Sequence, residues 1–444
     1  MSKPSVAIIG GGFAGLSAAI RVKQDLGINA TIFEASKDIG GAWFANSYPN
    51  CGCDVPSHLY SLSTDLNPNW SQLFSPRDEI LRYVQDVATR RNLYSHTRLE
   101  TKIPLCRFYP STQIPEQFKL FSGTVVHTAS WDPSVDFTNK RVAVIGTGAS
   151  AVQVLPPIAR LASQLYSYQR TVTWCTYRRQ YNYSRTDFDF INRIQNYKSF
   201  TARRFRTKLE TEMRARIEKL GRPDLVPVLV PEYTPGCKRL AISDNYIEAL
   251  CQSNVVVQTN RIKNVQSRTI TTENGDEQEF DILILATGFN VAGTGYLGDL
   301  EVLGKPNVSL NKAWHNDFPA LYKSTLVNGY PNMFVILGPS SFSGGTSAIF
   351  MGECQVSYCV GLMKKMIQDK IIAVEPLKEA QEKSVKRLKA GFVGTAWKSG
   401  CVSYYMNQMG DVTLFWSGSA VLFRWMLRGP STYKDLLIYK KNDF

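Results

Sequence analysis

The stretch Val6-Ala-Ile-Ile-Gly10-Gly-Gly12-Phe-Ala-Gly15 decides the fold of this chain, and Val142-Ala-Val-Ile-Gly146-Thr-Gly148-Ala-Ser-Ala151 repeats its pattern. In both, an apolar run typical of a buried strand leads into a glycine turn and then a helix. The first glycine permits the tight turn, the second lets the backbone approach a pyrophosphate, and the third position keeps helix and strand close. The sequence therefore predicts an α/β protein with two Rossmann-like dinucleotide-binding domains.

The residues after each second strand indicate which dinucleotide binds where. Glu34 ends the strand predicted at 30–33, where an acid can hydrogen-bond a ribose hydroxyl. At the matching place in the second unit stands Gln169-Arg170-Thr171, and an arginine there accommodates a 2′-phosphate. Two units imply two dinucleotides held face to face, the arrangement by which a nicotinamide reduces a flavin. NADPH is favoured over NADH, unless Arg170 is only a surface residue.

Composition excludes several other classes of protein. The 444 residues suffice for two or three domains, and 44% apolar with 20% charged residues is a globular composition. The net charge of +14 is concentrated in 193–219, which we interpret as a solvated helical surface, and no nucleic-acid motif or metal-ligand spacing is present. No signal peptide precedes the first strand, and the longest apolar stretch, 412–426, is too short and interrupted to span a bilayer. The nine cysteines are scattered, so we expect free thiols and a cytoplasmic location.

A motif between the two units carries a resemblance to a known family. Phe121, Gly123, His127, Trp131 and Asp132 match every fixed position of F-x-G-x-x-x-H-x-x-x-W-P/D. The chain thereby resembles the flavin-dependent Baeyer–Villiger monooxygenases, which hold FAD and NADPH. In that family the motif links the two domains, and its histidine is structural or conformational, so His127 is not nominated as a catalytic base.

Two further motifs extend the resemblance. Gly40-Gly41-Ala-Trp43 through Asp54 is similar to the family's G-G-x-W-x-x-x-x-Y-P-G-x-x-x-D, with Asn50 replacing the usual glycine or methionine. Asn tolerates positive φ, so the turn is expected to survive. Pro235-Gly-Cys-Lys238-Arg239 resembles the segment whose lysine binds the NADP phosphate and whose arginine lies over the flavin. The resemblance thus places Asp54 and Arg239 beside the flavin ring.

The resemblance implies insertion of one oxygen atom next to a ketone carbonyl, through a C4a-peroxyflavin, to give an ester or lactone. A permanently charged guanidinium would stabilise the developing oxyanion, and the Asp54 carboxylate would orient Arg239 and offset its charge. The alternatives are a flavin N- or S-monooxygenase, a disulfide reductase lacking its cysteine pair, and an inactive or truncated homologue. Which ketone is oxidised and the oligomeric state stay open.

The chain departs from the family in its FAD-binding part. We expect this part to comprise 1–138 and 291–444, with the NADPH-binding domain at 139–290 and a helical insertion at about 185–222. A small β-meander and a buried strand ending in an A-T/S-G turn should follow residue 102, and neither is found near 103. The chain is either a compact variant or the product of a defective gene model or splice form. The loss predicts weak FAD binding.

The candidate site residues fall into four groups by predicted role. The catalytic residues are Arg239 and Asp54; the FAD-binding residues are Gly10, Gly12, Phe13, Ala14, Gly15, Glu34, Gly41, Trp43, Asp54 and Tyr60; the NADPH-binding residues are Gly146, Thr147, Gly148, Ala149, Ser150, Ala151, Gln153, Arg170, Thr171 and Lys238; and the linker motif is Phe121, Gly123, His127, Trp131 and Asp132.

Overall fold

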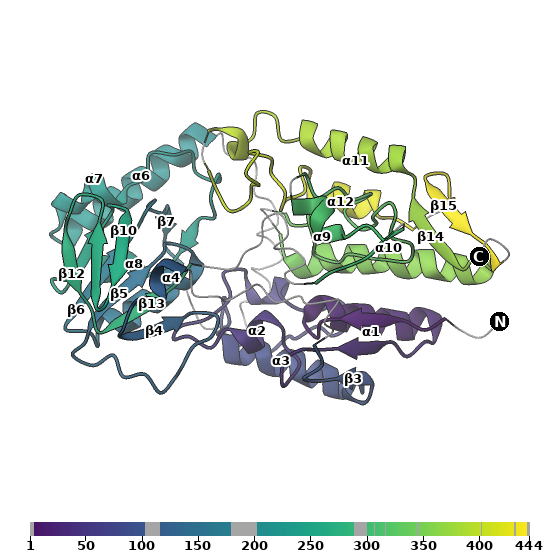
Figure 1. The fold of residues 1–444 in the computed structure, drawn as a ribbon, viewed down its shortest axis with the longest axis horizontal. Helices are drawn as coiled ribbons and strands as arrows, with labels where there is room; N and C mark the ends of the chain where they lie inside the picture. Colours follow the sequence, from purple (N-terminus) through teal and green to yellow (C-terminus); the bar gives the residue numbers. More distant parts are fainter. Residues whose placement is uncertain are drawn as a thin grey trace.

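The chain folds into two lobes that meet along one side (Figure 1). One lobe carries the N-terminal and C-terminal segments, and the other carries the central part of the sequence. The computed structural model describes residues 4–102, 116–178, 202–287, 300–305, 307–315, 317–343, 346–400, 402–429 and 432–441.

The first lobe contains a parallel sheet of three short strands in the order β1-β2-β3. These strands are β1 (Ala7–Ile9), β2 (Thr31–Phe33) and β3 (Thr97–Arg98). Helix α1 (Phe13–Leu26) follows β1 through the glycine turn and lies alongside α10 (Ala348–Gln368), as Figure 1 shows. The two helices share buried Val22, Val356 and Val360, so distant parts of the chain form one core.

Strand β1 lies at the edge of this sheet. In the doubly wound fold the first strand is central, with the order 3-2-1-4-5-6. Here the described sheet stops at β1, and Ile9 keeps 42% of its surface exposed. Between β3 and β4 (Thr124–His127) the described residues contain only a short 3-10 helix, η3 (Glu116–Phe118). An open edge of this kind is expected if the fourth strand and the β-meander are absent.

The second lobe is built on a five-stranded parallel sheet in the order β4-β13-β5-β6-β9. Besides β4 it contains β5 (Arg141–Ile145), β6 (Gln164–Tyr168), β9 (Val255–Gln258) and β13 (Ile282–Leu285). Strand β4 precedes the domain boundary predicted at residue 138. That boundary therefore lies after the first strand of this sheet, because β4 pairs with β13 in register.

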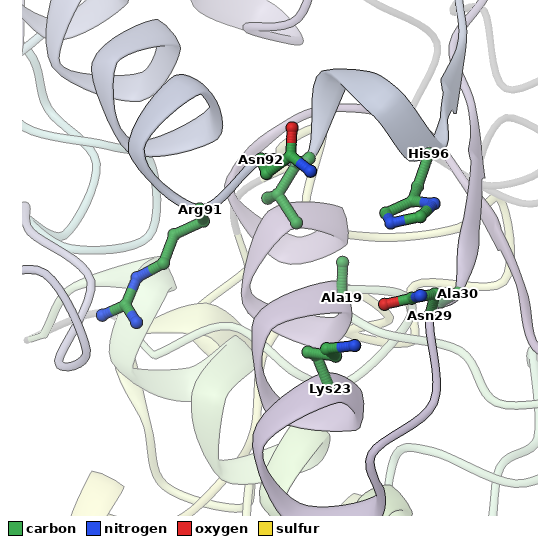
Figure 2. Close-up of a pocket in the computed structure, with 8 residues that line it drawn as sticks. Ala19, Lys23, Asn29, Ala30, Arg91, Asn92 and His96 are labelled. Atoms are coloured by element: carbon green, nitrogen blue, oxygen red, sulfur yellow. The ribbon is translucent and has the colours of Figure 1, made fainter.

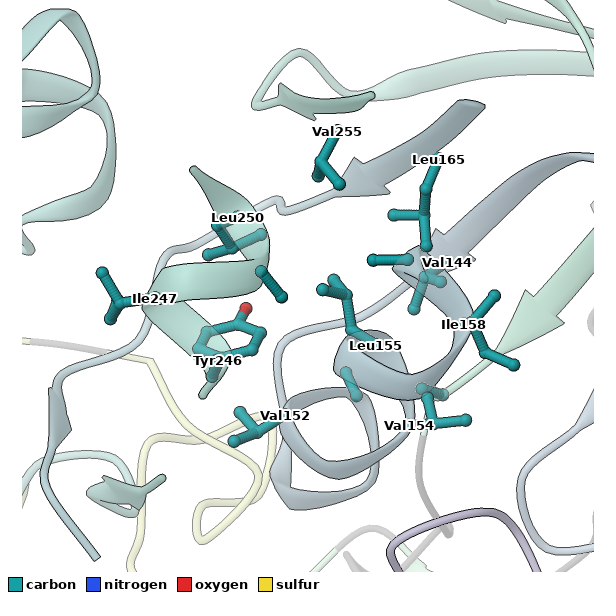
Figure 3. Close-up of a cluster of buried hydrophobic side chains, with 14 of the residues drawn as sticks. Val144, Val152, Val154, Leu155, Ile158, Leu165, Tyr246, Ile247, Leu250 and Val255 are labelled. Atoms are coloured by element: carbon teal, nitrogen blue, oxygen red, sulfur yellow. The ribbon is translucent and has the colours of Figure 1, made fainter. Parts of the chain in front are cut away.

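The core of the second lobe lies between this sheet and two helices. Helix α4 (Ala149–Ala159) follows the second glycine turn, and α8 (Tyr246–Leu250) packs against it. Figure 3 shows Leu155 of α4 and Tyr246 of α8 pointing into one apolar cluster with Val144 of the sheet. Burial of such side chains contributes about 1.5–3 kcal/mol each, so this cluster fixes the position of the second glycine turn.

The remaining elements cover the two sheets or connect them. The predicted helical insertion appears as α6 (Ala202–Lys219), η4 (Pro223–Leu225) and α7 (Val226–Leu229), and its first part lies outside the described residues. The others are α2 (Ala42–Ala45), η1 (Ser57–Leu59), α3 (Arg77–Arg90), η2 (Tyr94–His96), β7 (Cys175–Thr176), β8 (Ala241–Ile242), β10 (Ile262–Gln266), β11 (Thr269–Thr272), β12 (Glu277–Glu279), α9 (Leu310–His315), β14 (Ala373–Pro376), α11 (Lys378–Ala390), η6 (Ala396–Lys398), α12 (Ala420–Met426) and β15 (Leu436–Tyr439).

Candidate active site

The first glycine turn has the geometry of a diphosphate cradle. Gly10 adopts φ +100°, and its N–H donates to the Phe33 carbonyl at 2.8 Å. Gly12 occupies the N-cap of α1 without a side-chain cap, so the first-turn N–H groups, including that of Ala14, face the turn. A Cβ on Gly15 would lie 1.9 Å from the Gly10 carbonyl oxygen. The residues present therefore fit a dinucleotide phosphate.

Gly15→Ala is expected to lower the free energy of unfolding by about 3 kcal/mol or more, the upper end of overpacking costs. The added methyl would overlap a backbone oxygen, which cannot rotate away as a side chain can. Gly148→Ala is the matched control, because a Cβ there has no neighbour within 4 Å. Urea unfolding of both variants checks the prediction, and equal stabilities would contradict it.

Glu34 lies buried beneath this turn. Its carboxylate accepts from the Gly11 N–H at 2.6 Å through one oxygen and from the Ser36 N–H at 2.7 Å through the other. Each oxygen keeps a further lone pair for a ribose hydroxyl. The predicted acid therefore stands at the predicted place, and it also holds the glycine turn in shape.

Aromatic side chains and a second pair of glycines continue the site beyond the phosphate cradle. The Trp43 indole N–H donates to the Tyr60 hydroxyl at 3.2 Å, and the Tyr60 ring meets Phe13 edge-on at 5.2 Å. Gly41 has φ +56°, and a Cβ there would lie 3.0 Å from the Gly12 Cα. This close backbone approach explains why glycines stand on both sides of the cradle.

Asp54 and Arg239 meet at the junction of the two lobes. The guanidinium Nε donates to one carboxylate oxygen and NH2 to the other, both at 2.7 Å, although 185 residues separate the two. Burial opposes the charge on the guanidinium, but the Asp54 carboxylate outweighs it and raises the pKa of Arg239 above its usual range. The arginine is thus a fixed, permanently charged group, as the sequence predicts.

The loop that carries Asp54 has the turn predicted for it. Asn50 adopts φ +63°, which confirms that this residue takes the place of the usual glycine. Burial raises the pKa of Cys51 to about 11 and that of Cys53 to about 12, which disfavours the reactive thiolate form of both. A disulfide-reductase mechanism is therefore not supported at this loop.

Cys237, which immediately precedes Lys238, departs from the expectation of free thiols. It is disulfide-bonded, whereas the other cysteines that the structure describes, at 51, 53, 175, 251, 354 and 359, are free.

The second glycine turn repeats the first. Gly146 has φ +126°, and a Cβ there would lie 2.4 Å from the Ala286 carbonyl oxygen. Gly148 caps α4 through its backbone alone, and the space beside it is open within 4 Å. Ala149, Ser150 and the fully buried Ala151 form the first turn of α4. These residues fit a second diphosphate.

Arg170 and Lys238 are the two cations predicted to face the 2′-phosphate. Burial lowers the pKa of Lys238, and the positive charge of Arg170 lowers it further. The Thr147 hydroxyl donates to the Thr171 carbonyl at 2.9 Å and ties this strand end to the glycine turn. The role of the two cations in binding the phosphate stays a prediction.

Gln153 joins the two lobes. Its amide oxygen accepts from the Tyr48 hydroxyl at 2.8 Å, and its amide N–H donates to the Gly52 carbonyl at 3.0 Å. Both ends of the amide are thus engaged with the first lobe. The assignment of Gln153 to NADPH binding stays a prediction, and the contact between the lobes is a role that the sequence did not indicate.

The linker motif stabilises the end of the second sheet. A Cβ on Gly123 would lie 2.6 Å from the Asp281 carbonyl oxygen, and Phe121 is buried beside it. His127 accepts from the Ala129 N–H at 3.1 Å and reaches the Thr287 hydroxyl at 3.3 Å, while burial lowers its pKa. A buried neutral imidazole that joins two strand ends has the structural role expected from the family.

The last two motif residues hold the turn after β4. Trp131 stacks on Phe137 at 5.5 Å, and the exposed Asp132 carboxylate accepts from the Ser134 N–H and hydroxyl.

Arg77 and Arg178 were not found from the sequence. The Arg77 guanidinium donates to the Trp43 and Phe44 carbonyls, which end α2. Arg178 donates to the Cys53 carbonyl at 2.7 Å, directly before Asp54. Neither lies in a motif, so no spacing signal could have marked them.

Two cavities lie away from this site. One, of about 260 Å³, is lined by residues that include Lys23 of α1, Arg91 and His96 (Figure 2). The other, of about 550 Å³, lies between α1, α10 and α12 near Arg424. Neither contains a predicted site residue, so neither is assigned to the chemistry. Separately, no helix that the structure describes is both long and apolar enough to cross a membrane.

Comparison with known proteins bears directly on the family. Residues 8–76 match the NAD(P)-binding Rossmann-like domain, and residues 92–437 match the flavin-binding monooxygenase-like family. A Baeyer–Villiger monooxygenase of Pseudomonas aeruginosa is 31% identical over 98% of this chain and 90% of its own length. One of Streptomyces coelicolor is 29% identical over 94% and 90%. The first alignment runs over 484 positions, more than the 444 residues of this chain, so the relative carries residues that this chain lacks.

The fold agrees with the sequence comparison. OTEMO in complex with FAD and NADP superposes with a TM-score of 0.85 at 23% identity, covering 99% of both chains. Cyclohexanone-bound cyclohexanone monooxygenase superposes with a TM-score of 0.83 at 21% identity, covering 98% of this chain and all of that one. The predicted α/β fold with two dinucleotide domains is confirmed. The chain belongs to the flavin-binding monooxygenase-like family, and Baeyer–Villiger monooxygenases are among its relatives.

Proposed function

We propose that this chain is an FAD-dependent Baeyer–Villiger monooxygenase that uses NADPH and O2. It would convert a ketone to an ester or lactone, with NADP⁺ and water as the other products. The Asp54–Arg239 pair carries the proposal, because it presents a fixed positive charge where the two dinucleotide domains meet. The relatives do not favour a flavin N- or S-monooxygenase or an inactive homologue.

The residues of the two domains would bind different cofactors. We propose residues 1–138 and 291–444 for FAD and 139–290 for NADPH, with β4 counted in the second sheet. Gly10, Gly12 and Glu34 would hold the FAD, and Gly146, Gly148 and Arg170 the NADPH. The other residues predicted for each cofactor keep their proposed roles, and Gln153 in addition joins the two lobes.

The proposed mechanism depends on the positive charge of Arg239. Bound FAD, reduced by NADPH, supplies the activation of O2. Arg239 would stabilise negative charge that develops on the substrate oxygen, and it needs no reorganisation because Asp54 already orients it. None of the residues assigned here acts as a nucleophile or as a general base, since His127 is buried and engaged at a strand end.

A ketone-dependent assay tests this function. Purified protein with added FAD is given NADPH, O2 and a panel of cyclic, aromatic and larger ketones, beginning with cyclohexanone. Ester or lactone formed in step with NADPH loss supports the proposal. Amine oxide or sulfoxide without ester would favour the N- or S-monooxygenase, and no turnover with any substrate would reject the proposal. A cytoplasmic location is part of the proposal. The six free cysteines that the structure describes support it, the disulfide-bonded Cys237 does not, and fractionation tests it.

Arg170→Ala is expected to raise the KM for NADPH by about tenfold or more, the size of a lost charged hydrogen bond, and to leave the KM for NADH nearly unchanged. The reason is that only NADPH carries the 2′-phosphate that Arg170 and Lys238 would face. Steady-state kinetics with both coenzymes measure the preference. An unchanged preference would mean that the phosphate is recognised elsewhere.

A further inference from the structure

The loop 48–54 of the first lobe is held by side chains of the second. Tyr48 is buried within the core of the second lobe, although it belongs to the segment that leads to Asp54. Gln153 of α4 bonds both Tyr48 and Gly52. The position of this loop therefore depends on how the two lobes are joined.

Arg178, which follows β7 in the second lobe, contacts the residue directly before Asp54. Its NH2 donates to the Cys53 carbonyl at 2.7 Å and to the Phe74 carbonyl at 3.3 Å. The guanidinium also lies over the Phe74 ring, 5.2 Å from the centroid. One side chain thus joins the second lobe to two segments of the first.

The Cys53 carbonyl belongs to the peptide group that joins Cys53 to Asp54. A peptide group is planar, so fixing its oxygen also fixes the nitrogen of Asp54. The Cys53 N–H donates to the Ser75 carbonyl at 2.9 Å, so the residue before Asp54 is held on both sides. Gly52 lies beside the same guanidinium, because a Cβ there would lie 3.4 Å from the Arg178 NH2.

We propose that Arg178 is a positioning residue that fixes the backbone before Asp54 and thereby sets the Asp54–Arg239 pair only when the two lobes are docked. This inference rests on the proposed function for its effect on the reaction. Arg178 acts through Asp54 and does not itself touch the reacting atoms. The charge of Asp54 is thus held between two arginines, one bonded to its carboxylate and one to the peptide before it.

The test compares two variants. Arg178→Met removes the guanidinium donors but keeps an unbranched side chain, whereas Arg178→Lys keeps one charged donor group. We expect Arg178→Met to reduce flavin at nearly the wild-type rate but to form about tenfold less ester per NADPH consumed, as one charged hydrogen bond is lost. The NADPH that is consumed without ester formation should yield hydrogen peroxide from O2. Arg178→Lys should restore most of the ester yield. Arg214→Met is the control, because Arg214 pairs only with the exposed Glu210 on the same helix in the described contacts.

A second measurement does not depend on turnover. Hydrogen exchange of the protein without ligands should show faster exchange of peptides covering 50–54 in Arg178→Met, and wild-type exchange in Arg214→Met. Tyr48→Phe, which keeps the ring in the core but loses the bond to Gln153, should loosen the same loop. Unchanged exchange together with an unchanged ester yield would overturn the proposal, as would equal losses of flavin reduction and ester. A wild-type protein that forms no ester would reject the proposed function. The exchange data would still test whether Arg178 holds the loop 48–54.

Discussion

Arg239→Ala is expected to abolish ester formation, by about 10²- to 10³-fold, while NADPH still reduces the flavin. The substitution removes the only charge that Asp54 directly pairs with among the described ion pairs, and it leaves that carboxylate uncompensated beside the cofactors. Flavin reduction should survive because the two glycine turns lie on other segments and the substitution leaves the neighbouring Lys238 in place. The measurement is ester formed per NADPH consumed, together with anaerobic flavin reduction.

The chain offers a matched control for this variant. Arg222 and Asp224 form a similar two-pronged pair, with NH2 to carboxylate at 2.9 Å, but on an exposed turn of the second lobe. Exposed pairs contribute about 0–1 kcal/mol, so Arg222→Ala should keep full activity. If Arg239→Ala still forms ester, Arg239 has no part in the mechanism. If both variants lose activity equally, the loss is one of folding.

The purified chain is expected to carry less than one FAD per protein and to gain activity when FAD is added. Among the residues that the structure describes, strand β1, which leads into the FAD turn, has a neighbour on one side only, and Ile9 at its end is exposed. A binding site on a strand that is paired on one side must become ordered when the ligand binds, and this ordering costs free energy. Each 1.4 kcal/mol of that cost raises the Kd for FAD by about tenfold. Flavin absorbance after gel filtration, followed by titration with FAD, measures both quantities.

The second dinucleotide site serves as the internal control for this prediction. Its turn follows β5, which lies inside the five-stranded sheet with neighbours on both sides. NADP⁺ should therefore bind with ordinary affinity to protein stripped of FAD, as measured by calorimetry. A yellow protein with one FAD per chain, resistant to dialysis, would contradict the prediction and identify the chain as a self-sufficient compact variant.

The glycine turns, Glu34 and the Asp54–Arg239 pair could be predicted because each depends on local chemistry that is written in a motif. A turn with positive φ requires a residue such as glycine, and the structure shows positive φ at Gly10 and Gly146. Even the departure at Asn50 followed from its tolerance of that conformation. The pairing of Asp54 with Arg239 was accessible only through the family resemblance.

The contacts between the lobes could not be predicted. Gln153 is among the residues predicted to bind NADPH, but nothing in the sequence indicated that its amide also bonds the other lobe. Arg178 lies in no motif and gains its role from a backbone carbonyl, which every residue type carries. The domain boundary predicted at residue 138 separates β4 from the sheet in which it pairs, for a similar reason. Strand pairing joins segments that are far apart in the sequence, and a boundary drawn along the sequence does not capture it.

The burial of Tyr48 in the core of the other lobe has a consequence for the order of assembly. Its partner Gln153 follows 105 residues later in the chain, and the partner of Cys53, Arg178, follows 125 residues after it. Chains emerge from the ribosome N-terminus first, at about 5–20 residues per second, so the loop waits several seconds for the surface that completes it. The loop 48–54 therefore cannot complete its native contacts during synthesis until the central lobe has emerged.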